Sequence, residues 1–258
     1  ESEAWESMWD ELKSIFDFWI EKGVKVFRVD NPHTKSLRFW GWAISEIKKM
    51  HPEVIFLSEA FTRPKVMKRL AKEGFTQSYT YFTWRNTKYE LESYMKDLVE
   101  TDAKEYFRPN FWPNTPDILP EFLQYTGRPG YLIRLILAAT LSSNYGIYGP
   151  AFELLESEPL EYGREEYKDS EKYEIKKWQF GERESIARII ARINRIRQEN
   201  TALQNTNSLR FHDVDNDMLI CYTKESDDSK NIILVVVNLD PHHTHSGWIR
   251  LPLVKFGM

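Results

Sequence analysis

The sequence contains a single cysteine, Cys221, in 258 residues. One cysteine excludes a disulfide within the chain and is typical of proteins in the reducing cytoplasm. Long apolar runs are also missing, so no segment is predicted to cross a membrane. The acidic stretch over residues 1–11 is unlike a signal peptide. We therefore expect a cytoplasmic protein with no membrane partner.

The sequence also lacks a surplus of positive charge and any familiar metal motif. Its 35 Lys and Arg residues are intermixed with 39 Asp and Glu residues, and the formal net charge is −4. This balance offers no basic field to a nucleic acid, so we expect no nucleic-acid partner. Three histidines gather at residues 242–245, but their spacing fits no familiar metal motif, and a polar turn between strands is favoured. No metal and no cofactor are expected.

Aromatic residues are abundant, at 14% of the chain, with nine tryptophans and thirteen tyrosines. Most such residues belong to a hydrophobic core, and a chain of this length can bury one across one or two domains. Aromatic rings also stack on sugar rings, so the excess leans mildly toward a carbohydrate ligand.

Hydrophobic periodicity predicts alternating helices and strands followed by a run of short strands. Strands are predicted to begin near residues 24, 54, 75, 106 and 144, which gives five of the eight in a barrel. Helices are predicted at residues 5–21, 37–50, 64–73, 86–100, 117–125, 128–142 and 186–197. Four short strands follow at 209–212, 218–223, 231–238 and 248–253. The pattern predicts an α/β fold with a small antiparallel domain at its end.

Two carboxylates end successive predicted strands. Arg28 and Asp30 share one face of a buried strand, and the guanidinium lowers the pKa of the carboxyl, so a desolvated, ionised Asp30 is a candidate nucleophile. A structural Arg–Asp pair explains this stretch equally well. Glu59 ends the next strand, and a right-handed parallel crossover places both acids at the same edge of the sheet. Asp117 follows a third strand and is expected at that face. Convergent carboxylates, one ionised and one kept protonated by a drier site, suit glycosyl transfer.

Three segments then resemble conserved regions of the α-amylase superfamily. They are Phe-Arg-Val-Asp-Asn at 27–31, Leu-Ser-Glu-Ala-Phe at 57–61 and Asn-Phe-Trp-Pro-Asn-Thr-Pro-Asp at 110–117. Their details, with Asp-Asn-Pro-His-Thr-Lys at 30–35, look like the alpha-1,4-glucan:maltose-1-phosphate maltosyltransferases, over nearly the whole chain. The resemblance implies strands 4 to 8 of a TIM (β/α)8 barrel at 1–204 and an antiparallel β-sheet domain at 205–258. The first conserved region and three strands are expected to be missing, and the last domain to be truncated.

The resemblance implies a role for each matching residue. Asp30 is expected to be the nucleophile, Glu59 the acid and base, and Asp117 the group that stabilises the transition state. Arg28, Asn31, His33, Lys172 and Tyr173 are expected to contact substrate. Asn31 serves equally well as a turn cap, and His33 is more often a structural residue. The charged segment 153–180, which holds Lys172, reads without the resemblance as a solvated charge run.

The implied activity is maltosyl transfer with retention from alpha-maltose 1-phosphate to an alpha-1,4-glucan, with phosphate release, by an enzyme that is a homodimer in its full-length form. Two alternatives remain. An amylase-type hydrolase uses the same acids with water as acceptor, and an inactive half-barrel would have a structural or glucan-binding role. Phosphate release, measured against reducing-sugar release from starch, separates the two enzymes.

Overall fold

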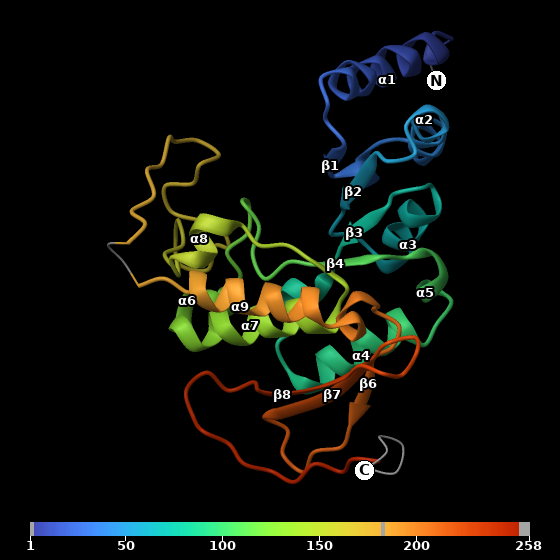
Figure 1. Ribbon diagram of the computed structural model, residues 1–258. Coiled ribbons are helices and arrows are strands. Elements are labelled where there is room, and N and C mark those ends of the chain that lie inside the picture. The colour runs from blue at the N-terminus through green and yellow to red at the C-terminus, as the bar shows by residue number, and fades with distance from the viewer. Residues whose placement is uncertain (1–2, 182–183, 253–258) are drawn as a thin grey trace. The chain divides into compact units, whose positions relative to one another are not determined.

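The computed structural model describes residues 3–181 and 184–252, which form two compact units (Figure 1). The first unit comprises the described residues up to Thr80 together with Asp102–Pro109. The second comprises Tyr81–Thr101 and the described residues from Asn110 onward.

The first unit alternates helices and strands as the sequence predicts. Gly23 ends the first helix in a left-handed conformation, with φ 92°, and its N–H donates to the Ile20 carbonyl at 2.8 Å. The elements in order are α1 (Trp5–Glu21), β1 (Val26–Asp30), the 3₁₀ turn η1 (Pro32–Thr34), α2 (Leu37–Met50), β2 (Ile55–Glu59), α3 (Pro64–Lys72), β3 (Gln77–Tyr79) and α5 (Ala103–Tyr106).

The strands of the first unit are parallel. β1 pairs with β2, and the register places Asp30 opposite Glu59. β2 pairs with β3 on its other side, with Ser58 opposite Ser78. The predicted parallel crossover is confirmed, and both acids lie at the carboxyl ends of neighbouring strands.

Helices α1 and α2 cover one face of this sheet with aromatic side chains. Phe56 is fully buried, and Phe27 stacks on it with ring centroids 5.7 Å apart. Phe16 of α1 meets both rings edge-on, and Trp40 of α2 packs in the same cluster. Burying one such side chain is worth roughly 1.5–3 kcal/mol. The cluster therefore fixes the strand ends that carry the acids.

The second unit contains a helical layer and two sets of strands. The helix α4 (Lys88–Val99) begins at a capping box, in which Thr87 and Glu90 satisfy each other's backbone N–H groups. Helices α7 (Gly127–Leu141) and α9 (Ala187–Glu199) lie side by side (Figure 1). The other elements are η2 (Tyr81–Trp84), β4 (Pro109–Phe111), α6 (Glu121–Tyr125), β5 (Asn144–Tyr145), α8 (Gly149–Glu153) and η3 (Thr201–Gln204). β4 and β5 are parallel.

The chain after α9 forms the predicted antiparallel sheet, with order β6 (Arg210–His212), β7 (Leu219–Glu225) and β8 (Ile232–Asn238). The prediction of a strand at residues 248–253 is wrong for residues 248–252, which the structure describes. Only one isolated β-bridge forms there, between Ile249 and Val214. The Trp248 N–H donates instead to the Asp215 side chain at 2.7 Å, and Pro252 has no N–H to give to a ladder. Leu253 lies outside the described residues.

Three other boundaries differ from the prediction, and proline explains two. The strand predicted to begin at Tyr106 begins at Pro109, because residues 103–106 form α5. The helix predicted from Asp117 begins at Glu121, directly after Pro120. Gly149 and Pro150, predicted to close the alternating series, instead open α8, where proline in the first turn lacks only an N–H that would be unpaired there.

Among residues 3–181 and 184–252, no helix is both long and apolar enough to cross a membrane.

Candidate active site

Arg28 and Asp30 lie on the same face of β1, as predicted. The exposed and partly buried residues alternate along this strand, so Phe27 and Val29 face the aromatic core. The Arg28 Nη1 atom lies 3.7 Å from Asp30 Oδ2. The prediction that Asp30 is desolvated on a buried strand is wrong for this chain, since 65% of its side chain is exposed. Within the described residues β1 ends the strand order, with β2 as its neighbour.

Asn31 fixes the turn that follows the candidate nucleophile. Its backbone is left-handed, with φ 45° and ψ 49°, a conformation that asparagine tolerates better than most residues. Its N–H donates to the Glu59 carbonyl at 3.0 Å, which ties the ends of the two strands together. Its Nδ2 donates to Asp30 Oδ1 at 2.9 Å. Asn31 occupies the N-cap position of the turn, but its side chain makes no capping hydrogen bond and orients the Asp30 carboxylate instead. Its contact with substrate stays a prediction.

Glu59 is the buried member of the acid pair, with 7% of its side chain exposed. Burial raises the pKa of this carboxyl to about 6. The hydrogen bond and charge of Arg28 oppose the rise, while the neighbouring Asp30 carboxylate adds to it. Glu59 thus keeps its proton at a pH where an ordinary glutamate has lost it, as the sequence argument required of the general acid.

Arg28 bridges the two acids. Its Nη2 forms an ion pair with Glu59 Oε2, while its Nη1 faces Asp30. Burial on its own lowers the pKa of Arg28, but the hydrogen bond and charge of Glu59 and the charge of Asp30 raise it overall. The guanidinium therefore remains a permanent cation between two carboxylates of different exposure.

His33 lies on the 3₁₀ turn after Asn31 and is partly buried. Its Nδ1 atom is buried and has no hydrogen-bond partner among residues 3–181 and 184–252. The backbone beside it is held by Trp40, whose Nε1 donates to the Pro32 carbonyl at 2.9 Å. The predicted substrate contact of His33 stays a prediction.

Asp117 and Lys172, which lie 55 positions apart in the sequence, meet in the second unit. Lys172 Nζ is 3.0 Å from Asp117 Oδ1, and this hydrogen bond raises the pKa of the lysine. The ammonium also lies 5.8 Å from the ring centre of Tyr173. The three residues that the resemblance selected from this unit therefore form one cluster, and the long loop is more than a solvated charge run.

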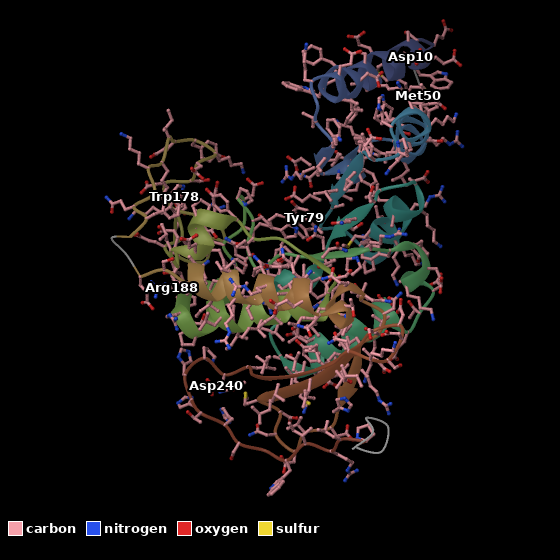
Figure 2. The ribbon with its side chains drawn as sticks, viewed as in Figure 1. Asp10, Met50, Tyr79, Trp178, Arg188 and Asp240 are labelled. Carbon is pink, nitrogen blue, oxygen red and sulfur yellow. The ribbon has the colours of Figure 1, made fainter. Side chains whose placement is uncertain are left out.

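Hydrogen bonds that the sequence reasoning missed anchor the loops around this cluster. The Asn114 Nδ2 group donates to the Tyr167 hydroxyl at 2.8 Å, and Asn114 Oδ1 accepts from the Tyr148 N–H at 2.9 Å. Glu171 accepts from the Tyr148 hydroxyl and, at 3.0 Å, from Trp178 Nε1 (Figure 2). Asn114 lies inside the motif at 110–117, so its position was the available signal. Tyr167, Glu171 and Trp178 lie in the charged segment 153–180, which has no periodicity.

Within the described ranges, no group of three or more His, Cys, Asp and Glu side chains is arranged to hold a metal ion. The histidines at 242–245 form hydrogen bonds with the Asp240 carboxylate. Its Oδ2 lies 3.0 Å from His243 Nδ1 and 2.8 Å from His245 Nε2. This cluster holds the segment after β8 in place.

Solved structures show what fold this geometry belongs to. An alpha-amylase from H. orenii matches 90% of this chain and 55% of its own with a TM-score of 0.70 at 15% identity. The match to an Anoxybacillus alpha-amylase covers 90% of this chain and 52% of the amylase, with a TM-score of 0.67 at 14% identity. The chain therefore has the fold of the C-terminal part of an α-amylase-type (β/α)8 barrel, followed by a small antiparallel sheet.

Sequence relatives narrow the class to one family. The chain is 57% identical, over its full length, to the alpha-1,4-glucan:maltose-1-phosphate maltosyltransferase of Chlorobaculum tepidum, and 55% identical to that of Methylacidiphilum infernorum. A family model described as "GLGE, C-terminal" matches residues 211–258. The chain belongs to this maltosyltransferase family by sequence. It spans 39% and 38% of the length of these two relatives.

Proposed function

We propose that this protein transfers maltosyl units from alpha-maltose 1-phosphate to an alpha-1,4-glucan, in alpha-glucan synthesis, and releases phosphate. The observation that carries the proposal is the acid pair in register, with Asp30 exposed and Glu59 buried at a pKa of about 6. Two acids in unlike environments suit a retaining glycosyl transfer. The names of the relatives supply the donor and the acceptor.

The proposed reaction is a double displacement. A carboxylate oxygen of Asp30 attacks the anomeric carbon, the bond from that carbon to the phosphate oxygen breaks, and phosphate leaves with its electron pair. Glu59 gives its proton to the departing oxygen. In the second step Glu59 takes the proton of the glucan 4-hydroxyl, whose oxygen displaces Asp30 from the anomeric carbon. Two inversions give retention.

The other residues bind or orient in this proposal. Arg28 faces the carboxylate of Asp30 and limits the rise in the pKa of Glu59. Asp117 holds sugar hydroxyls and stabilises positive charge in the transition state, and Lys172 fixes its carboxylate. Tyr173, whose side chain is exposed, gives a sugar ring a face to pack on. Asn31 and His33 are proposed as hydrogen-bonding contacts to substrate.

The test is a donor assay with two readouts. We expect maltose 1-phosphate and maltohexaose to yield phosphate and lengthened glucans, with little reducing sugar from starch alone. Reducing sugar from starch without phosphate release would favour the hydrolase. Neither product would favour a glucan-binding or structural role.

Three further proposals concern organisation. We propose a catalytic barrel part at 1–204 and a C-terminal β domain at 205–258, supported by the sheet that begins with β6 and by the family-model match. Light scattering tests the proposed homodimer, which rests on the family resemblance. The cytoplasmic location is proposed from the buried, unpaired thiol of Cys221 and is tested by cell fractionation.

A further inference from the structure

A groove of about 760 Å³ lies in the second unit. Its walls are the first turn of α4, Phe122 of α6 and the segments that flank β7 and β8, at residues 217–218 and 239–241. A volume of this size is typical of a small-molecule site. None of the residues assigned above to donor or acceptor chemistry lines it.

Tyr89 provides the groove with an aromatic face. The tyrosine is 80% exposed, although the helix that carries it is well buried on its other side. Helix α4 packs through Leu91, Met95 and Leu98, so its place in the fold does not depend on Tyr89. Met218, also exposed in part, extends the apolar surface. A ring beside such a surface suits the C–H face of a sugar.

The charged side chains that line the groove are mainly negative. Glu92, Asp217 and Asp240 bring three carboxylates, and Asp240 is held by the histidines after β8 (Figure 2). The cation Lys88 already donates to the Val214 carbonyl at 3.1 Å and lies 3.9 Å from Asp217. The net negative lining disfavours phosphates and other anions. It suits a neutral ligand that donates hydrogen bonds.

We infer that this groove binds a neutral alpha-1,4-glucan chain at a second site, which holds the polymer while the carboxylates act on its end. The identity of the glucan rests on the proposed function. The ring of Tyr89 stacks on a glucose unit, and hydroxyls of the chain donate to the carboxylates of Glu92 and Asp217. We choose a glucan as the ligand because the groove combines an exposed aromatic ring with negatively charged hydrogen-bond acceptors.

The experiment is native gel electrophoresis in gels that contain increasing glycogen. Wild-type protein should be retarded, and Tyr89→Ala should raise the apparent Kd at least 5-fold. Tyr89→Phe keeps the ring and should bind as wild type does. Tyr125→Ala removes an exposed tyrosine that lies outside the groove and is the matched control. Thermal unfolding of every variant checks the fold.

Retardation separates this inference from the proposed function because it needs no turnover. Loss of retardation in Tyr89→Ala alone supports the groove even if no phosphate is released from maltose 1-phosphate. Phosphate release with unchanged retardation in Tyr89→Ala overturns the groove and leaves the function standing. Absence of retardation in wild-type protein also overturns it.

Discussion

The cations of the two units have different hydrogen-bond partners. In the first, Arg28 stands between the carboxylates of Asp30 and Glu59 at the ends of parallel strands. In the second, Arg134 donates to the carbonyls of Phe82 and Arg85, and Lys224 donates to the carbonyls of Leu141 and Thr206. Both arrangements satisfy the donors. Only the first leaves two acids with unlike environments, which acid–base chemistry requires.

The difference lies in what burial does to the ionisation of each group. Beside carboxylates, Arg28 has its pKa raised overall. Among carbonyls, burial lowers the pKa of Arg134 to about 9 and that of Lys224 to about 7. A perturbed pKa alone would therefore point to Arg134 and Lys224 as readily as to Glu59. The distinction comes from the partner groups and from their place at strand ends.

The largest expected effect is on Asp30, in a preparation that is active with maltose 1-phosphate. Asp30→Asn should lower kcat at least about 1,000-fold, because a neutral amide cannot form the covalent intermediate. Asp10→Asn, an exposed change on α1, is the matched control and should keep wild-type activity (Figure 2). If Asp30→Asn retained a tenth of the wild-type rate, the nucleophile would lie elsewhere.

Next in size is the removal of the bridging cation. Arg28→Met should lower kcat/KM roughly 100-fold. It should also shift the alkaline limb of the pH–activity profile to higher pH. Arg28 holds the pKa of Glu59 down, so its loss raises that pKa above about 6. Wild-type activity falls as pH rises through the pKa of Glu59, and the activity of the variant should fall at a higher pH.

Arg28→Lys is the matched control for that limb. Lysine keeps the positive charge but cannot face both carboxylates as the two Nη atoms of arginine do. The alkaline limb of the pH profile of this variant should therefore stay nearer that of the wild-type protein. An unmoved limb in Arg28→Met would mean that the ionisation of Glu59 does not control the rate.

Much of the first unit could be predicted from sequence because its signals are local and agree. The helices at 5–21 and 37–50 match their predicted bounds, and the acids that end β1 and β2 stand in register. The exposure of Asp30 was missed because burial depends on neighbouring strands, which a local pattern does not report. The low pKa of Lys224 was missed for the same reason, since β7 reads only as an apolar strand.

The second unit was harder to predict because its site depends on long-range hydrogen bonds. The resemblance selected Asp117 and Lys172, but nothing in local periodicity indicated that they would meet. Asn114, Tyr148 and Glu171 organise the loops through side chains that are far apart in sequence. Prolines at 120 and 150 set boundaries that apolar spacing alone had placed elsewhere.

A structural cation should affect stability rather than chemistry. Arg134→Leu leaves the carbonyls of Phe82 and Arg85 without this donor, in a fully buried site. We expect the free energy of unfolding to fall by about 2–4 kcal/mol in urea denaturation, since buried acceptors lose their partner. Arg188→Leu, on the exposed face of α9, should change it by less than about 0.5 kcal/mol. Equal stability of the two variants would show that the carbonyls find other donors.

The smallest expected effect tests Lys224 through pH. Burial lowers its folded-state pKa to about 7, while the unfolded chain keeps the ordinary value of 10.5. Between these values the unfolded state binds more protons than the folded state, so this lysine makes stability rise with pH. Lys224→Met removes that dependence. The stability of the variant relative to wild type should therefore fall by about 1–3 kcal/mol between pH 7 and pH 9. Urea denaturation at both pH values measures this, with Lys230→Met, an exposed change, as the control. A difference that does not vary with pH would mean that Lys224 titrates normally, and that carbonyls stabilise a buried ammonium as well as carboxylates stabilise Arg28.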